Sequence, residues 1–128
     1  MFEEMSSSDS QSTALKKLSL QDVPLEPTRH GALKKVLLRH EDVSSQLMFL
    51  NEVYVAPGER LETHEHENME EIFYFLDGKG IMQVGKDTQP VTAGDRVIVP
   101  IKTVHILENT GAAEMKFICF GVKALPAK

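Results

Sequence analysis

The sequence has a single cysteine, no tryptophan and few aromatic residues. Cys119 is the only thiol among 128 residues, and aromatic residues make up 6% of the chain. One cysteine cannot form an intramolecular disulfide or a thiolate metal cluster, so a scaffold stapled by disulfides is excluded. The shortage of aromatic residues predicts a core that is mostly aliphatic.

Basic character and long hydrophobic runs are also missing. The formal net charge is −5 at pH 7, so the chain offers no broad basic field to nucleic acid or to an anionic membrane surface. No window approaches the roughly 18 apolar residues of a membrane span. The first residues, Met1 to Met5, carry acid where a signal peptide needs base. We therefore expect a cytoplasmic protein with no nucleic-acid partner and no membrane partner.

The overall composition is typical of one globular domain. Hydrophobic residues make up 41% and charged residues 26% of the chain, which supports a packed core in a length common for single domains. Residues 6–13 are polar and Ser-rich, and we expect them to be disordered. We expect a polar tail and lead-in over 1–28, one domain over 29–124 and a C-terminal tail over 125–128. A short helical turn at 14–18 is compatible with the lead-in.

From Gly31 onward, short β-rich runs are separated by Gly, Pro, Asn and Asp. The predicted strands cover 32–39, 46–55, 61–66, 71–76, 79–84, 88–91, 96–99, 104–109 and 114–122. Their spacing is roughly 8–12 residues, and no helical period is long enough to connect parallel strands. The pattern indicates an all-β domain, an antiparallel sandwich or barrel.

Two histidines lie two residues apart in a segment framed by glycines. On a β-strand, side chains at i and i+2 point to the same face, so His64 and His66 are able to reach one ion from a single strand. A carboxylate at the start of the next strand would supply a third ligand across a short turn. Glu71 and its neighbour Glu70 are both candidates for that role. The alternation of the first strand does not continue through the turn, so it cannot tell which of the two glutamates faces the ion.

A third histidine, His105, comes from a later segment framed by glycine and proline. Three imidazoles and one carboxylate suit one divalent transition metal, which can be Fe, Mn, Ni, Co or Zn. Four protein ligands on a six-coordinate ion leave two positions for substrate, water or dioxygen. The predicted metal ligands are therefore His64, His66, His105 and one of the two glutamates, Glu71 or Glu70.

The two segments resemble the two motifs of the cupin superfamily. The first motif, G-x5-H-x-H-x3,4-E-x6-G, is matched with every spacing kept by Gly58, His64, His66, Glu71 and Gly78. The second, G-x5-P-x-G-x2-H-x3-N, is matched by Gly94, Pro100, His105 and Asn109. Lys102 stands where the family has glycine, which implies a different turn or some strain. The spacing to Gly78 favours Glu71 over Glu70, so the resemblance implies His64, His66, Glu71 and His105 as the metal ligands.

The resemblance implies the double-stranded β-helix, or jelly-roll barrel, of small single-domain cupins, preceded by the disordered tail. It also implies a mononuclear metal site. We expect an enzyme that acts on a small organic molecule, either as a dioxygenase-type oxidoreductase or as an isomerase or decarboxylase with a Lewis-acid metal. The alternative is a non-catalytic module that binds a small ligand or a metal. Because fold alone does not choose between these functions, both stay open, although the aliphatic and Phe-rich interior favours a small, weakly polar substrate.

Alternation along the strand that carries Glu71 predicts an apolar outer row. If Glu71 faces inward, Phe73 and Phe75 follow it into the barrel. The residues then expected outside are Ile72, Tyr74 and Leu76. Such a row needs cover, and a homodimer would provide it.

Five other polar or reactive residues have ordinary interpretations. Asn109 is expected to close a turn by hydrogen bonds to the backbone. His30 and His40 lie outside both motifs and are interpreted as surface or loop residues. Cys119 lies in an apolar strand and is interpreted as a small core side chain. Lys102 is interpreted as an exposed turn lysine rather than a group that binds a substrate carboxylate.

Overall fold

The computed structural model describes residues 14–63 and 65–126, and this part of the chain is almost entirely β-structure. Its only helical elements are two 3-10 turns, η1 (Leu20–Asp22) and η2 (His40–Asp42). The strands are β1 (Leu25–Pro27), β2 (Leu33–Arg39), β3 (Leu47–Val55), β4 (Arg60–Thr63), β5 (Met69–Asp77), β6 (Lys79–Val84), β7 (Asp87–Thr92), β8 (Arg96–Val99), β9 (His105–Asn109) and β10 (Met115–Lys123). The expected all-β class is confirmed.

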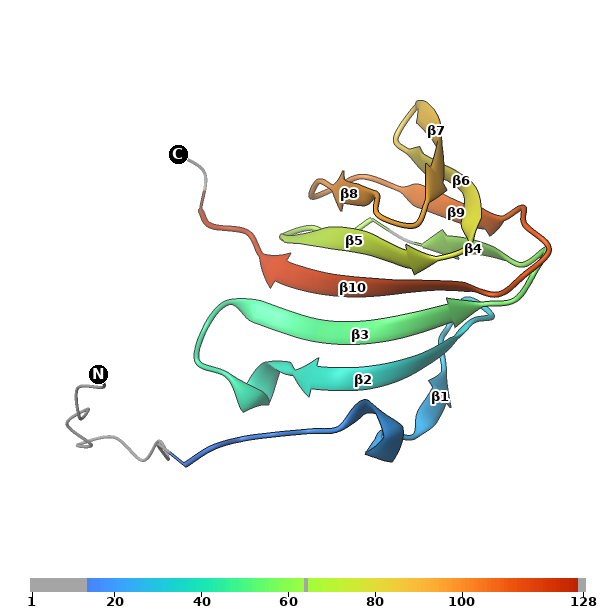
Figure 1. Cartoon of the computed structure of the whole chain (residues 1–128). Helices are drawn as coiled ribbons and strands as arrows, with labels where there is room; N and C mark the ends of the chain where they lie inside the picture. Colours follow the sequence, from blue (N-terminus) through green and yellow to red (C-terminus); the bar gives the residue numbers. More distant parts are fainter. Residues whose placement is uncertain (1–13, 64, 127–128) are drawn as a thin grey trace.

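The strands form two antiparallel sheets that pack against each other (Figure 1). One sheet has the order β1-β2-β3-β10-β5-β8 and the other the order β4-β9-β6-β7. Neighbouring strands are often distant in the sequence, since β10 lies between β3 and β5. This topology places β5 and β9, which carry two of the predicted metal ligands, in opposite sheets that share one interior.

Every second side chain along a strand points into the core, so one face of each sheet is buried. Along β10, Met115, Phe117 and Cys119 are buried and the residues between them are partly exposed. Phe73 and Phe75 of β5 are buried in the same way, and their rings lie 5.2 and 5.4 Å from that of Phe117 between centroids. The core is otherwise mostly aliphatic, as the composition predicts.

The glycine that ends the first motif is required by a close approach of two backbone segments. Gly78 follows β5 and has a φ of +88°. A Cβ atom at this position would lie 2.8 Å from the Cα of Met115 on β10. Because the obstacle is backbone rather than a flexible side chain, no other residue fits without moving a strand.

Strands β2 to β10 correspond to the nine predicted strands, most of them within two residues at each end. The largest difference is at the predicted strand 61–66, because β4 ends at Thr63. His66 therefore lies in the loop that follows the strand. Its carbonyl accepts a hydrogen bond from the Lys102 N–H at 2.7 Å, which takes the place of pairing within a sheet.

The segment before β2 differs from the expectation more than any other. Residues 14–18 form no helix, since one short exposed turn does not offset the cost of helix nucleation. Strand β1 was not expected and pairs with β2 at the edge of the larger sheet. Val23 is buried, and the Leu20 carbonyl accepts a hydrogen bond from the Lys35 ammonium at 2.9 Å. The expected disorder of residues 6–13 concerns residues outside the described part.

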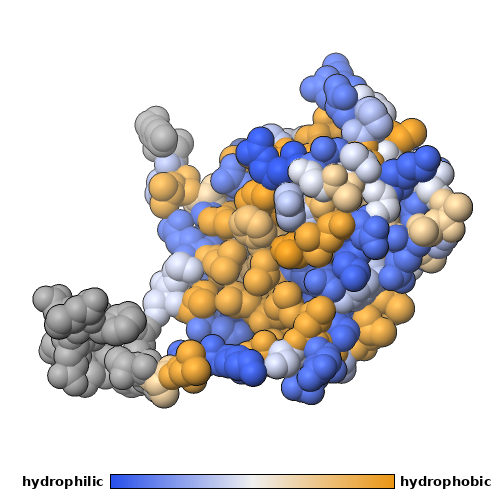
Figure 2. Space-filling model, in the orientation of Figure 1, coloured by the Kyte–Doolittle hydropathy of each residue, from blue (hydrophilic) through white to orange (hydrophobic). Residues whose placement is uncertain are grey.

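The outer face of the larger sheet carries an apolar row. Tyr74 and Leu76 are 43% and 37% exposed, whereas Phe73 and Phe75 are buried, so the predicted alternation of β5 is confirmed. Four aligned residues on adjacent strands β8, β5, β10 and β3 form the row, namely Ile98, Ile72, Phe120 and Leu50. Figure 2 shows apolar surface across this face.

None of the helical segments in the described ranges has the length and apolar character that a membrane crossing requires.

Candidate functional site

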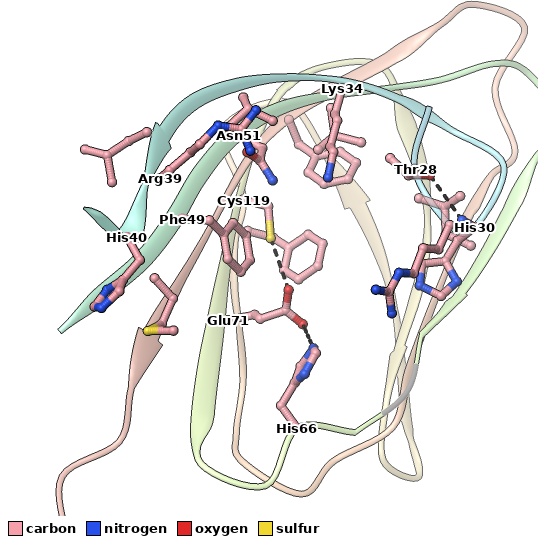
Figure 3. A pocket seen from close by; sticks show the side chains of 18 of the residues that line it. Thr28, His30, Lys34, Arg39, His40, Phe49, Asn51, His66, Glu71 and Cys119 are labelled. Carbon is pink, nitrogen blue, oxygen red and sulfur yellow. Dashed lines mark hydrogen bonds and ion pairs between the residues drawn. The ribbon is translucent and has the colours of Figure 1, made fainter. Parts of the chain in front are cut away.

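A cavity of about 770 Å³ opens between the two sheets (Figure 3). Its walls come from β2, β3, β10 and β5 of the larger sheet and from β4 and β9 of the smaller one. The apolar part of the lining includes Val36, Phe49, Val53, Leu61, Phe73 and Phe117. His66, Glu71 and His105 lie together on the same lining. The structure therefore brings three of the four predicted ligands into one cavity.

Glu71 lies at the centre of this group. It is the third residue of β5 and faces the interior, with 8% of its surface exposed, while the neighbouring Glu70 is exposed. The Glu71 Oε1 atom lies 3.3 Å from Nε2 of His66 and 3.3 Å from Nε2 of His105. Of the two adjacent glutamates, the structure thus turns Glu71 toward the imidazoles.

The two histidines differ in burial and in the backbone segment that carries them. His105 begins β9 and is 2% exposed, and its ring meets the Phe73 ring edge-on at 5.6 Å between centroids. β4 pairs with β9 on one side of this residue and β6 pairs on the other. The His66 side chain is 40% exposed and comes from the loop after β4. His105 is therefore a fixed wall residue, and His66 lies nearer the solvent.

His64, the remaining predicted ligand, lies outside the described residues. Within residues 14–63 and 65–126, no group of three or more His, Cys, Asp or Glu side chains is arranged to hold a metal ion by itself. The complete set of three histidines and one glutamate therefore stays a prediction.

The surroundings of Glu71 nevertheless fit a cation. Its Oε1 atom is buried and has no hydrogen-bond donor among the described residues, although two imidazole nitrogens lie close to it. Ligand atoms in adjacent positions around one ion, each about 2.1 Å from it, lie about 3 Å apart. The observed 3.3 Å spacing is close to this value. Imidazole nitrogen and carboxylate oxygen are also donor types that divalent transition metals accept.

The carboxyl group of Glu71 is held in the form that binds a cation. Burial raises its pKa, but the contact with His105 and the charges of His105 and His66 lower it by more, so the pKa lies below its ordinary value. The net effect keeps the group ionised near neutral pH.

Cys119 contacts the same carboxylate from β10. Its thiol donates a weak hydrogen bond to Glu71 Oε2 at 3.6 Å, and the residue is buried. Burial raises the pKa of the Cys119 thiol well above its ordinary value, and the charge of Glu71 raises it further. Cys119 is thus a neutral core side chain, in agreement with the sequence interpretation, and it also orients the carboxylate.

Because thiolate is the reactive form of cysteine, native Cys119 should react slowly with iodoacetamide at pH 8. We expect alkylation at least about a hundredfold slower than in the urea-unfolded chain, measured by mass spectrometry over time. The unfolded chain is the matched control, since it contains the same single thiol. Stoichiometric labelling of the native chain within minutes would contradict the burial described here.

Lys102 adopts the backbone conformation that glycine adopts freely. Its φ is +56°, and among the described residues it is the only non-glycine with positive φ. The strain suggested by the departure from the family motif is therefore present at this turn. The same residue supports the site, because its backbone N–H holds the loop that carries His66.

Replacing Lys102 by glycine should relieve this strain. We expect Lys102→Gly to raise the free energy of unfolding by up to about 1 kcal/mol. The relief of backbone strain should outweigh the larger conformational entropy that glycine loses on folding. Urea unfolding measures the change. The control is Lys86→Gly, at an exposed turn lysine without positive φ, which should lower stability by roughly 0.5 kcal/mol. Equal losses in both variants would show that Lys102 is not strained.

Sequence reasoning missed a set of polar residues on the cavity wall nearest β2. The two histidines interpreted as ordinary surface or loop residues, His30 and His40, both line the cavity. Lys34 of β2 and Asn51 of β3 line it as well (Figure 3). No local motif identifies these residues. Lys34 and Asn51 reach the cavity through the pairing of β2 with β3, and His30 and His40 lie in the segments just before and just after β2.

Comparisons with known proteins agree with the observed fold. The family model described as the cupin domain matches residues 51–121. An uncharacterised protein of Methanocaldococcus jannaschii is 33% identical over 92 residues, which are 72% of this chain and 74% of that protein. An oxalate-binding protein of Thermotoga maritima is 29% identical over 82 residues, 64% of this chain and 68% of that protein.

A solved structure shows the same fold. The crystal structure of a predicted oxalate decarboxylase from Thermotoga maritima superposes with a TM-score of 0.78 at 22% identity, covering 84% of this chain and 99% of that one. The expected double-stranded β-helix is thereby confirmed as the fold of this domain.

Proposed function

Because the chain belongs to the cupin domain family, we propose that it is a mononuclear metal-binding protein that acts on a small organic molecule. The proposed ligands of the ion are His64, His66, Glu71 and His105. The metal is one divalent transition ion from the group Fe, Mn, Ni, Co and Zn, since this donor set accepts all of them.

The observation that carries the proposal is the buried Glu71 Oε1 atom. It lies 3.3 Å from two imidazole nitrogens and has no hydrogen-bond donor in the described part of the chain. A cation held between this oxygen and the two imidazole nitrogens would give the buried Oε1 atom the partner that it lacks. His64 precedes His66 by two residues, a spacing typical of ligands that approach one ion together.

When bound, such an ion supplies Lewis-acid or redox chemistry. The chain's own residues provide a cavity of about 770 Å³ for a small molecule, within the range common for ligand sites. Val36, Phe49 and Phe117 supply apolar walls that exclude water from a carbon skeleton. His66 is the exposed member of the group and lies where a substrate would enter.

The names of two similar proteins point to one class of small molecule. One relative is an oxalate-binding protein, and one similar structure is a predicted oxalate decarboxylase. We include small carboxylates among the substrates or ligands of this chain on that basis. The reaction is proposed as either dioxygenase-type oxidation or isomerase or decarboxylase chemistry. The alternative is a module that binds a small ligand without turnover.

An activity screen separates these functions. The full chain, loaded in turn with Fe²⁺ and Mn²⁺, is incubated with diketones, catechols, thiols and small carboxylates while oxygen uptake and products are recorded. Oxygen uptake with substrate loss supports the oxidative reaction, and substrate loss without oxygen uptake supports isomerase or decarboxylase chemistry. Saturable binding without turnover of any compound would favour the non-catalytic alternative.

We also propose that the outer face of the larger sheet is covered in a homodimer. Tyr74, Leu76 and Ile98 are 43%, 37% and 43% exposed on this face, next to partly buried apolar neighbours. Apolar patches of this kind commonly mark interfaces. Sedimentation velocity should give a dimer for the intact chain and a monomer for Ile98→Glu. Ile81→Glu is the control, because Ile81 is 42% exposed on the other sheet. A monomeric intact chain would contradict the dimer.

The absence of nucleic-acid and membrane partners stays a prediction from the acidic composition. Cytoplasmic location stays a prediction from the acidic first residues and the lack of a long apolar run.

A further inference from the structure

We propose that Lys34 and Asn51 form a second anchoring subsite in the cavity, for a carboxylic acid that also carries a hydroxyl group. This inference rests on the proposed function, because the other end of the same ligand would lie at the Glu71 group. Figure 3 shows both residues across the cavity from His66. No motif in the sequence marks them, and neither belongs to the proposed set of metal ligands.

Asn51 is a buried polar side chain with an unmet hydrogen bond. It is 9% exposed and lines the cavity, and its Oδ1 atom has no hydrogen-bond partner in the described part of the chain. On the adjacent strands its aligned neighbours are Val36 and Cys119. Because native proteins rarely leave a buried acceptor unpaired, the cavity wall here is built to receive a donor. A ligand hydroxyl supplies one.

Lys34 supplies a positive charge on the same wall. It is half-buried on β2, aligned with the buried Val53, and its side chain points into the cavity (Figure 3). Within residues 14–63 and 65–126, no hydrogen bond or ion pair engages its ammonium group. The neighbouring Lys35 faces the other side of the sheet and donates to the Leu20 carbonyl. The charge of Lys34 is therefore available to a ligand.

The other cations around the cavity are less suited to this role. Arg39 forms an ion pair with Glu26 at 3.2 Å, and its side chain is 59% exposed. Arg29 is exposed at the rim. A phosphate group usually collects several donors, such as arginine forks or helix N-termini. A single half-buried ammonium beside apolar walls fits a singly charged carboxylate better.

The experiment uses the full chain and pairs of acids that differ by one hydroxyl. Malate against succinate and glycolate against acetate are titrated by calorimetry into the manganese-loaded chain and into the chelator-treated chain, with inorganic phosphate as a further probe. Lys34→Met should weaken malate binding at least about tenfold. Lys35→Met, the same change one residue away on the opposite face, should leave binding within about twofold. Lys34→Gln provides a second variant, which removes the charge but keeps a polar group at the end of the side chain.

Asn51→Leu tests the hydroxyl contact separately. The intact chain should bind malate more tightly than succinate. This variant should bind the two acids about equally, with its affinity for succinate unchanged. Phosphate binding as tight as malate binding would contradict the choice of a carboxylate.

Metal content measured on every variant keeps the two proposals separate. Weakened malate binding in Lys34→Met with unchanged manganese supports the subsite. Loss of manganese from the intact chain would contradict the metal site but not the subsite, because the dependence on Lys34 is also measured in the chelator-treated chain. Equal malate binding by intact chain and Lys34→Met, or no acid binding by the intact chain, would overturn the subsite.

Discussion

Replacing Asn109 by leucine is expected to lower the free energy of unfolding by about 3–5 kcal/mol. Asn109 is 1% exposed, and its Nδ2 atom donates to the carbonyls of Val55 at 2.8 Å and Ala113 at 3.0 Å. Its Oδ1 atom accepts a hydrogen bond from the Gly111 N–H at 2.9 Å. Leucine makes none of these bonds and leaves backbone groups beside β9 without partners. Urea unfolding monitored by circular dichroism measures the loss.

Asn51 offers a matched control for this prediction. Both asparagines are buried, but Asn51 leaves its Oδ1 atom without a partner. Asn51→Leu should therefore leave the unfolding free energy unchanged or raise it slightly, since an unsatisfied buried group is removed. Similar losses in both variants would show that the hydrogen bonds of Asn109 are not the source of its effect.

Replacing Glu71 by glutamine is expected to weaken metal binding at least about a hundredfold. The substitution keeps the size of the side chain and removes the negative charge that faces His66 and His105. It also places a weakly basic amide where the ion would need a carboxylate. Calorimetric titration of the chelator-treated chain with Mn²⁺ measures the affinity.

Glu70→Gln provides the control, because Glu70 is the exposed neighbour on β5. Its manganese affinity should stay within about twofold of that of the intact chain. If Glu70→Gln lost the metal and Glu71→Gln kept it, the assignment between the two glutamates would be reversed.

Local rules predicted much of this fold. Period-two alternation correctly divided β5 into buried Phe73 and Phe75 and outward Tyr74 and Leu76. The punctuation by glycine, proline and asparagine located most strands, and the turn role of Asn109 is confirmed by its hydrogen bonds to three backbone groups. Alternation, turn residues and the bonds of Asn109 to Gly111 and Ala113 depend on residues close together in the chain, so a single sequence contains the information. The bond of Asn109 to Val55 spans 54 positions and could not be read from the local pattern.

The features that were missed depend on pairing between distant segments. Strand β1 exists because it pairs with β2, although three residues have little preference of their own. Lys34 and Asn51 enter one cavity wall because β2 pairs with β3, which aligns Lys34 with Val53 and Asn51 with Val36. Alternation within one strand shows which residues share a face, but it does not show which distant strand lies beside it.

His66 shows the same limit within the site. Its loop position is fixed by a hydrogen bond from Lys102, 36 positions further along the chain by residue number. The interpretation of Lys102 as an ordinary exposed lysine describes its side chain, which is exposed. It misses the role of its backbone N–H, because a residue's type carries little information about such a bond.

The number of metal ions bound per chain shows whether His64 and His66 belong to a metal site. The intact chain is compared with the double variant His64→Ala plus His66→Ala by elemental analysis, after exposure to Fe²⁺ or Mn²⁺ and removal of free ions. The proposed metal site predicts close to one ion per intact chain and almost none in the double variant, with both proteins folded by circular dichroism. An unchanged metal content in the folded double variant would contradict it.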